Sequence, residues 1–295
     1  MKAAMEGVMR YFQRLRTRLR LYWPLTKSLQ TSLLLSTGLA GYMSARCPVL
    51  HWDTLLFLAV SLFLAIAGST ILNMWYDRDI DAVMNRTHHR PLADGRVAPA
   101  EALRLGLVIS VVGVGMAALM DPLYGLIVFG GWFFDVVVYT LWLKRRTAWS
   151  IVWGGVAGGM PILAGRAYGM GAVDGVGILF ALAVLFWIPT HILTFAMRYS
   201  GDYRAAGIPT FPTVYGFRAT RFVIALSSVI ASLAIIAAGV LIEIQGGVIW
   251  VLAAMSAGLF LLAVASVVRP NERINFGLFK YASLYMFSAM ILVSI

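Results

Sequence analysis

The sequence has 295 residues, of which 60% are hydrophobic and 13% are charged. Its apolar runs of about twenty residues match the length of a membrane-spanning helix, and a soluble fold could not bury so much apolar surface. The formal net charge of +11 is spread over five separated segments, so it points to topology signals and to contact with anionic lipid or substrate, and it gives no case for nucleic acid.

Nine apolar runs in the chain are each long enough to cross a bilayer as a helix. They cover residues 28–46, 54–75, 101–120, 122–142, 149–168, 175–196, 219–242, 246–268 and 274–295. Single Asp, Glu or Arg residues in the short connections mark the breaks between them. We therefore expect an all-α membrane bundle of nine transmembrane helices, with residues 28–295 forming one domain.

Residues 1–27 lack the uninterrupted apolar core of a signal peptide. Apolar side chains recur here at three- and four-residue spacing, at Val8, Phe12, Leu15, Leu19 and Tyr22. Arginines surround them, so the pattern predicts an amphipathic helix that lies on the inner membrane surface and ends before Pro24. Lys27 follows at the membrane boundary, either as an interfacial anchor or as a contact for a phosphate group.

Basic residues are distributed unevenly over the predicted connections. Of the 24 Lys and Arg residues, 22 fall on one side of the predicted bundle, and Arg46 and Arg166 fall on the other. By the positive-inside rule, the richer side faces the cytoplasm. The N-terminus is therefore expected in the cytoplasm and the C-terminus, after nine spans, outside.

The most polar stretch of the chain, residues 73–92, reads NMWYDRDIDAVMNRTHHRPL. Asn73, Asp77 and Asp81 are spaced four apart, so on a helix they form one ridge where the second predicted span ends. Two carboxylates near a helix C-terminus repel each other and are disfavoured by the helix dipole, unless a cation neutralises them. Magnesium suits this position, because it takes one or two protein carboxylates and completes its shell with water and substrate phosphates. A solvated charged turn between two helices is the alternative.

Two arginines follow the ridge, at Arg86 and Arg90. A helix that carries Asp81 should end at or before Arg90, because Pro91 disfavours helical geometry in the residue before it. The guanidinium groups could therefore lie on a loop folded back over the ridge, where they would bind diphosphate oxygens. They are equally well explained as topology charges.

Ionisable residues are also predicted within two later spans. Asp135 lies inside the fourth span, and a carboxylate at that depth needs a polar cavity or an arginine from a neighbouring helix. Tyr139 and Lys144 follow at the inner end of the same span and point into a site only if that helix faces it. A lone histidine such as His191 is usually part of a hydrogen-bonded core, although Pro189 opens the backbone ladder nearby and favours a cavity.

A second polar connection, residues 201–216, is rich in Gly and Pro and carries Asp202 at its start. Like the connection after the ridge, it joins an acidic start to a proline-bearing segment, so the two connections form a faint internal repeat. The repeat suggests two carboxylate-bearing helix ends that face each other across one cavity.

The run from Asn73 to Leu92 resembles the signature N-x3-D-R-D-I-D-x2-M-x-R-T-x2-R-P-L of the intramembrane aromatic prenyltransferase superfamily, in the form found in its protoheme IX farnesyltransferase branch. Four further segments extend the resemblance in the right order: YTLWLKRRT at 139–147, GGVAGGMP at 154–161, PTH at 189–191 and DYRAAGIP at 202–209. Together they cover nearly the whole chain, so the joint signal is far more specific than any one motif.

The resemblance implies a helical bundle around a central cavity, capped on the cytoplasmic side by the two loop motifs. It implies a site that holds magnesium and a prenyl diphosphate through Asn73, Asp77, Asp81 and, from the opposite loop, Asp202. Diphosphate contacts are then implied for Arg86, Arg90, Lys144 and Arg145. Tyr139 would lie near the developing allylic cation, and His191 near a porphyrin acceptor.

Several positions depart from the family pattern. Ser28 replaces the proline that usually follows the lysine, and Gly165-Arg166 replaces a Gly-Trp pair. Ile192 and Leu193 stand where the family usually has an aromatic pair. The last two changes would line the acceptor pocket, so they bear more on the acceptor than on the diphosphate chemistry.

The implied reaction transfers a farnesyl group from farnesyl diphosphate to a vinyl group of protohaem IX, releases diphosphate and captures water to give a hydroxyethylfarnesyl product. The implied location is the cell membrane, with the active site open to the cytoplasm and membrane lipid around it. A membrane partner from the haem pathway that hands over the haem is compatible with this.

Two alternatives remain open. One is the same transfer to a hydroxybenzoate, a quinone precursor or an archaeal glycerol lipid; Arg198, four residues before Asp202, breaks the second DxxxD common in those branches and so favours haem. The other is a transporter that uses cytoplasmic carboxylates. It predicts ionisable residues throughout several spans, whereas Asp135 and His191 are nearly alone at depth.

Overall fold

The structure is a computed structural model that describes residues 9, 13, 16, 18–45, 51–244 and 246–294. Within this range all regular structure is helical, which confirms the predicted all-α class. The long helices are α2 (Ser28–Met43), α3 (Trp52–Tyr76), α5 (Pro99–Met120), α6 (Pro122–Phe133), α7 (Ser150–Met170), α8 (Gly175–Arg198), α10 (Phe211–Leu241), α11 (Gly246–Val268) and α12 (Glu272–Leu292). The shorter elements are η1 (Trp23–Thr26), α4 (Arg78–Val83), η2 (Phe134–Leu143) and α9 (Ser200–Ala205). The amphipathic helix expected over residues 1–27 lies largely outside the described residues.

Six helical segments within the described range are long and apolar enough to cross a membrane. They are α3, α5, α6 together with η2, α8, α10 and α11. Large apolar side chains such as Leu119 on α5 and Val268 on α11 are exposed, as lipid-facing helices require. The helices α2, α7 and α12 coincide with three further predicted spans, but they do not meet the same measure of length and hydropathy.

Two groups of helices pack around the interior of the bundle. One core cluster draws mainly on α8, α10, α11 and α12, and the other on α2, α3, α5, α6 and α7. The helix α7 contacts both α2 and α8 and so links the groups. A Cβ atom at Gly165 would collide with the carbonyl oxygen of Gly38, so α2 and α7 approach this closely only because position 165 has no side chain.

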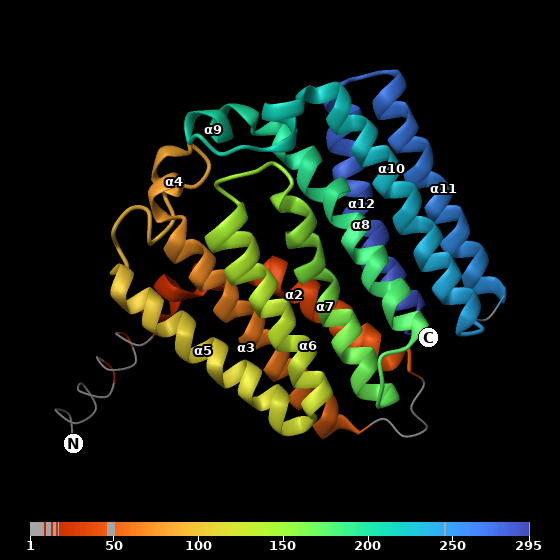
Figure 1. The fold of residues 1–295 in the computed structure, drawn as a ribbon, viewed down its shortest axis with the longest axis horizontal. Coiled ribbons are helices and arrows are strands. Elements are labelled where there is room, and N and C mark those ends of the chain that lie inside the picture. Colours follow the sequence, from red (N-terminus) through yellow and green to blue (C-terminus); the bar gives the residue numbers. More distant parts are fainter. Residues whose placement is uncertain are drawn as a thin grey trace.

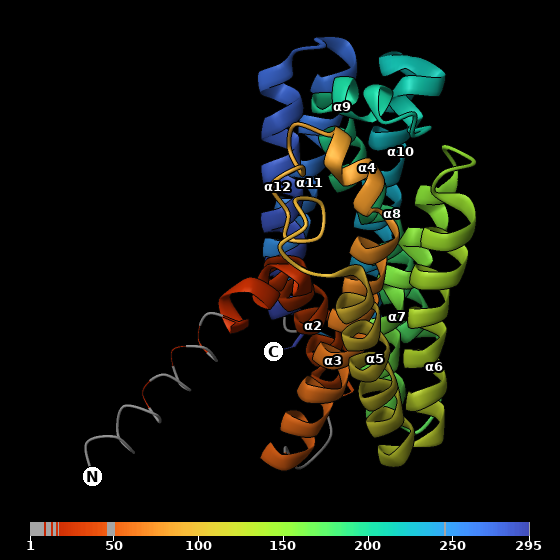
Figure 2. The same cartoon turned by 90° about the vertical axis from the view of Figure 1, so that its left-hand side faces the viewer.

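The two loop motifs cap the same end of the bundle, as the sequence predicts (Figures 1 and 2). The elements α4 and α9 lie at this end, together with the turn after η2 and the turn between α11 and α12 (Figure 1). Ile80 and Met84 from the α4 segment pack against Ile208, which follows α9. The connections that carry most of the basic residues therefore gather at one end of the bundle.

The second half of the predicted span 122–142 is a π-helix, where the sequence predicts a continuous α-helix. At its end the backbone N–H of Lys144 donates to the carbonyl oxygen of Tyr139, five residues earlier, at 2.8 Å. π-Helical turns are rare and frequently occur at functional sites. Apolar periodicity does not reveal such a turn, because the same residues fit an α-helix.

The predicted loop over residues 201–216 is wrong at both ends, where α9 and the first turn of α10 are helical. Thr210 and Thr213 form a reciprocal capping box, and Pro212 lies in the first turn, so the helix starts earlier than hydropathy suggests. Gly216 adopts a φ of 79° and kinks α10 after this first turn. Residues 211–215 are thereby directed separately from the long helix that follows the kink.

Candidate active site

Asn73, Asp77 and Asp81 form the predicted ridge where α3 meets α4. The N–H of Asp77 donates to the carbonyl of Asn73 at 3.0 Å, and the N–H of Asp81 donates to the carbonyl of Asp77 at 2.8 Å. The helical spacing is therefore kept across the junction, although Asp77 caps one helix and precedes the next. All three side chains are buried, which argues against the solvated charged turn.

Asp77 is held by cations from the end of η2. Lys144 Nζ forms an ion pair with Asp77 Oδ2, and Arg145 Nη2 lies 4.0 Å from Asp77 Oδ1. That second oxygen is buried and accepts no hydrogen bond. Arg145 also binds both oxygens of Asp79, at 2.7 and 2.8 Å, on the exposed side of α4.

The other two ridge residues each contact a further cation. Arg90 Nη1 donates to both oxygens of Asp81, at 2.7 and 2.9 Å. Lys27 Nζ donates to the side-chain oxygen of Asn73 at 3.0 Å. The loop after α4 therefore folds back over the ridge at Arg90, which is the first of the two interpretations of these arginines. A lysine from the start of α2 reaches the same place.

Asp202 joins the second loop motif to the first. It accepts a hydrogen bond from the backbone N–H of Arg86 at 3.2 Å and another from the side chain of Asn85 at 3.3 Å. Among the described residues it makes no hydrogen bond to Asp77 or Asp81. The guanidinium of Arg86 lies over the rings of Phe195 and Tyr199, at 5.0 and 5.6 Å, and its Nε atom is buried without a hydrogen-bond partner.

A ladder of three polar contacts joins α3 to η2. Ser69 Oγ donates to Asp135 Oδ2 at 2.7 Å, Asn73 donates to Thr140 Oγ1 at 2.9 Å, and Asp77 pairs with Lys144. The partners on α3 are four residues apart, whereas those on η2 are five and then four apart. The wide π-turn supplies this uneven spacing and so aligns both sets of side chains.

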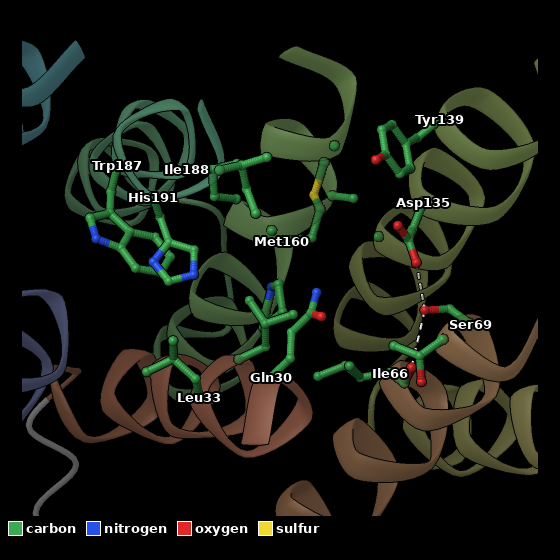
Figure 3. A pocket seen from close by; sticks show the side chains of 18 of the residues that line it. Gln30, Leu33, Ile66, Ser69, Asp135, Tyr139, Met160, Trp187, Ile188 and His191 are labelled. Atoms are coloured by element: carbon green, nitrogen blue, oxygen red, sulfur yellow. Dashed lines mark hydrogen bonds between the residues drawn. The ribbon is translucent and has the colours of Figure 1, made fainter. Parts of the chain in front are cut away.

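A cavity of about 590 Å³ extends from this ladder into the bundle. Figure 3 shows Asp135, Tyr139 and Ser69 on one wall, His191 and Trp187 on the opposite wall, and Gln30 reaching in from α2. Most of the remaining lining is apolar, including Leu33, Ile66, Met160 and Ile188. Tyr139 therefore points into the cavity, and its ring also lies 5.6 Å from Lys144 Nζ.

His191 is fixed in the cavity wall. Its ring stacks between Trp187 and Phe279, at centroid distances of 5.0 and 4.4 Å. Its Nδ1 atom lies 3.0 Å from Ser283 Oγ. The second ring nitrogen has no hydrogen-bond partner among the described residues, so it is available to a molecule in the cavity.

Two lysines concentrate positive charge at the ridge. Burial, together with the nearby charges of Arg90 and Lys144, lowers the pKa of Lys27 to about 8. Burial acts in the same direction on Lys144, but the charge of Asp77 outweighs it and raises the pKa of Lys144 above its ordinary value. This end of the bundle thus offers several ammonium and guanidinium groups beside buried carboxylates.

The donor atoms at the ridge fit a magnesium ion that shares its shell with a substrate. No group of three or more His, Cys, Asp or Glu side chains converges on a metal position among the residues that the structure describes. Magnesium in phosphate sites needs only one or two protein carboxylates, because phosphates and water complete the octahedron. The unbonded oxygen of Asp77 provides one such buried ligand atom.

Nine of the residues proposed from the sequence gather at the capped end: Lys27, Asn73, Asp77, Asp81, Arg86, Arg90, Lys144, Arg145 and Asp202. Tyr139 and His191 line the cavity below them. Sequence reasoning missed Thr140, Asn85 and Ser283, which give no signal of their own. It also missed Ser69, although Ser69 extends the four-residue spacing of the ridge by one turn.

Comparison with known proteins identifies the family. The profile of the UbiA prenyltransferase family matches residues 34–287. The chain belongs to this family. A protoheme IX farnesyltransferase from Archaeoglobus fulgidus is 40% identical to this UbiA-family chain. The matched region covers 88% of this chain and 91% of the relative. One from Desulforudis audaxviator is 36% identical over 90% of the chain and 84% of the relative.

Solved structures share the fold of this UbiA-family protein. A digeranylgeranylglyceryl phosphate synthase superimposes with a TM-score of 0.78 at 16% identity, covering 94% of this chain and 98% of the other. A UbiA homologue from Archaeoglobus fulgidus, bound to GPP and Mg²⁺, gives a TM-score of 0.68 at 18% identity and covers 94% and 99%. By its family match and its apolar helices, the UbiA-family chain is a multi-pass membrane prenyltransferase.

Proposed function

We propose that the protein transfers a farnesyl group from farnesyl diphosphate to a vinyl group of protohaem IX and releases diphosphate. The observation that carries this proposal is the 40% identity to a protoheme IX farnesyltransferase over 88% of the chain. The site is compatible with it, because a cationic end for a diphosphate lies beside Tyr139, which lines an apolar cavity for a prenyl chain and a large aromatic acceptor.

The capped end would bind the diphosphate of the donor. Its phosphate oxygens would be held by a set of cations, namely Lys27, Arg86, Arg90, Lys144 and Arg145. As the bond between C1 of the farnesyl group and the diphosphate oxygen breaks, these groups stabilise the charge that grows on the leaving group. Guanidinium forks match phosphate oxygens in pairs, and the ammonium groups act as point charges.

A magnesium ion would share this end with the diphosphate, held by Asp77 and Asp81 and supported by Asn73 and Asp202. When bound, it supplies Lewis-acid stabilisation of the leaving diphosphate. The solved UbiA homologue bound to GPP and Mg²⁺ supports this assignment. Asp202, which holds the backbone of Arg86, would also fix the loop that closes over the donor.

The cavity would receive the farnesyl chain and the porphyrin. Its apolar lining excludes bulk water from the allylic cation, and the ring of Tyr139 would stabilise that cation through its π face. His191, held by Ser283 and two aromatic rings, would position the porphyrin on the opposite wall. The vinyl carbon then bonds to C1 of the farnesyl group, and water adds to the resulting cation.

The membrane arrangement is part of the proposal. We place nine spans in the cell membrane, with residues 28–295 as one domain and with α2, α7 and α12 as the three less apolar spans. The distribution of basic residues supports a cytoplasmic N-terminus and a site that opens to the cytoplasm. A haem-pathway membrane protein would be a suitable partner for delivery of the acceptor.

Reconstitution with defined substrates tests the function. The purified protein in lipid vesicles is incubated with farnesyl diphosphate, haem and Mg²⁺, and the extracted haem is weighed by mass spectrometry. We expect haem heavier by one farnesyl group plus one hydroxyl group. Diphosphate release without any prenylated haem would overturn the assignment of haem, and parallel incubations with a hydroxybenzoate, a quinone precursor or a glycerol phosphate lipid would then identify the acceptor class.

A further inference from the structure

Asp135 is a half-buried carboxylate in the cavity wall that the diphosphate chemistry does not use. It lies on η2, one turn deeper than Tyr139, and its side chain faces the cavity (Figure 3). A carboxylate inside a membrane bundle is costly and is retained where it has a partner or a task. No arginine or lysine forms an ion pair with it in the described part of the chain.

The hydrogen bonds of Asp135 leave one oxygen free. Ser69 donates to Oδ2 at 2.7 Å, which fixes the orientation of the carboxylate. The other oxygen, Oδ1, has no hydrogen-bond partner among the described residues, and it is not among the fully buried polar atoms. In Figure 3 it faces the space between the two walls of the cavity. A water molecule in that space would therefore find one fixed acceptor.

Asp135 is the only carboxylate among the described residues that line the cavity. The other candidate base is His191, but it lies on the opposite wall and contacts Ser283. The ladder between α3 and η2 places Asp135 one helical turn, about 5 Å, below the contact of Asn73 with Thr140. Asp135 thus lies just inside the end where the diphosphate would leave.

That position is where the second cation of the reaction would form. When the vinyl carbon attacks C1 of the farnesyl group, the positive charge passes to the vinyl carbon next to the porphyrin ring. This carbon is two bonds from C1, so it stays close to the ladder. Water addition there requires a base, because the oxygen must lose a proton as it bonds to carbon.

We infer that Asp135 is the general base that deprotonates the water which captures this cation. The water oxygen forms a bond to the cationic carbon, its proton passes to the free oxygen of Asp135, and Ser69 holds the other oxygen. The sum of the reaction is haem, farnesyl diphosphate and water giving hydroxyethylfarnesyl haem, diphosphate and one proton. This inference rests on the proposed function and adds the residue that determines hydroxylation.

Product composition tests the inference. Without the base, the cation instead loses a proton from the adjacent CH₂ group to solvent, which gives an alkene lighter than the hydroxylated product by one water. We expect Asp135→Asn to lower the ratio of hydroxylated to alkene product by about 100-fold, the lower range for loss of a general base. Asp135→Glu should restore part of the ratio, and Ser69→Ala should lower it by a smaller factor. In the wild type, incubation in H₂¹⁸O should label the product hydroxyl.

The ratio is independent of the amount of folded protein, so poor expression of one variant does not obscure it. The inference would be overturned if Asp135→Asn kept the wild-type ratio of hydroxylated to alkene product. If Asp135→Asn yields no prenylated haem, wild-type ratios in both Ser69→Ala and Asp135→Glu would overturn it instead. The inference would also be overturned if His191→Asn lowered this ratio and Asp135→Asn did not, because His191 would then be the base. Failure of the proposed function looks different, because the wild type itself would then yield no prenylated haem.

Discussion

Lys144 and Asp77 form a buried ion pair that joins the end of the π-helix to the end of α3. The side chains are 18% and 3% exposed, respectively, so water screens the pair little. Desolvation of the two charges offsets most of their attraction, so such a pair adds little stability by itself. The pair instead fixes positions: it holds one cation and one carboxylate beside each other, next to Tyr139 in the cavity wall.

The first prediction concerns Asp77. Replacement by Asn keeps the size of the side chain but removes the charge that a metal ion and Lys144 both require. We expect Asp77→Asn to lower Mg²⁺-dependent diphosphate release by at least about 100-fold. The assay measures phosphate after pyrophosphatase treatment, with size-exclusion chromatography as the check that the protein remains folded.

Asp79→Asn is the matched control. Asp79 lies on α4 next to the ridge, but its carboxylate is exposed and binds only Arg145 among the described residues. Exposed ion pairs contribute little to stability, so this variant should remain folded. Because Asp79 is not one of the three ridge residues, the variant should also keep most of its turnover. Wild-type release by Asp77→Asn, or equal losses in both variants, would contradict the role of the ridge.

The second prediction uses the pair as a double-mutant cycle. Lys144→Met alone leaves Asp77 buried without its main partner, and we expect a loss of about 3 kcal/mol in the free energy of unfolding. In Lys144→Met combined with Asp77→Asn no charge is left unpaired, so much of that stability should return. Thermal unfolding in detergent measures all four proteins. Additive losses would show that the two side chains do not depend on each other.

Much of this arrangement could be predicted from local sequence. The spacing of Asn73, Asp77 and Asp81 survives across the helix junction because the backbone hydrogen bonds remain helical there. Because Pro91 disfavours helical geometry at Arg90, the sequence allows a loop that folds back over the ridge. In the structure Arg90 donates a hydrogen bond to Asp81. Each of these signals acts within about one helical turn of the residues concerned.

The remaining features depend on contacts between distant segments. The π-turn of η2 aligns its side chains with those of α3: Thr140 and Lys144 contact Asn73 and Asp77, each 67 residues earlier in the chain. The same holds for Asp202, which binds Asn85 and the backbone of Arg86 rather than the ridge. Hydropathy and spacing contain no information on such pairings, because many registers of two apolar helices bury equal area.

The third prediction concerns the close contact of α2 with α7. A methyl group at position 165 would collide with backbone atoms of Gly38 and Tyr42, which cannot rotate away as a side chain could. We expect Gly165→Ala to lower the free energy of unfolding by about 3 kcal/mol. Gly115→Ala is the control, because a Cβ there meets open space, and a helical Gly→Ala change should be neutral or slightly stabilising. Equal unfolding temperatures for the two variants would contradict the packing argument.

The last prediction concerns an ion pair at the end of the bundle opposite the site. Arg166 binds both oxygens of Asp174 at 2.7 to 3.0 Å and also donates to the carbonyl oxygen of Ser44 at 2.8 Å, so it ties together the ends of α2, α7 and α8. These hydrogen bonds hold the pKa of Asp174 below its ordinary value. A lowered pKa in the folded state stabilises the fold at pH values above the unfolded pKa of about 3.9.

Asp174→Asn should therefore lower the unfolding temperature at pH 7 by about 5 °C, which corresponds to about 2 kcal/mol. The difference from the wild type should shrink as the pH falls through the lowered pKa of Asp174, because the wild-type carboxylate then becomes neutral as well. Asp121→Asn is the matched control: Asp121 caps α6 through the N–H of Tyr124, as Asp174 caps α8 through Gly177, but no arginine binds it among the described residues. Because Asn also caps helices, the control should change little. A pH-independent difference for Asp174→Asn, or an equal loss in the control, would show that the charge on Asp174 does not stabilise this end of the bundle.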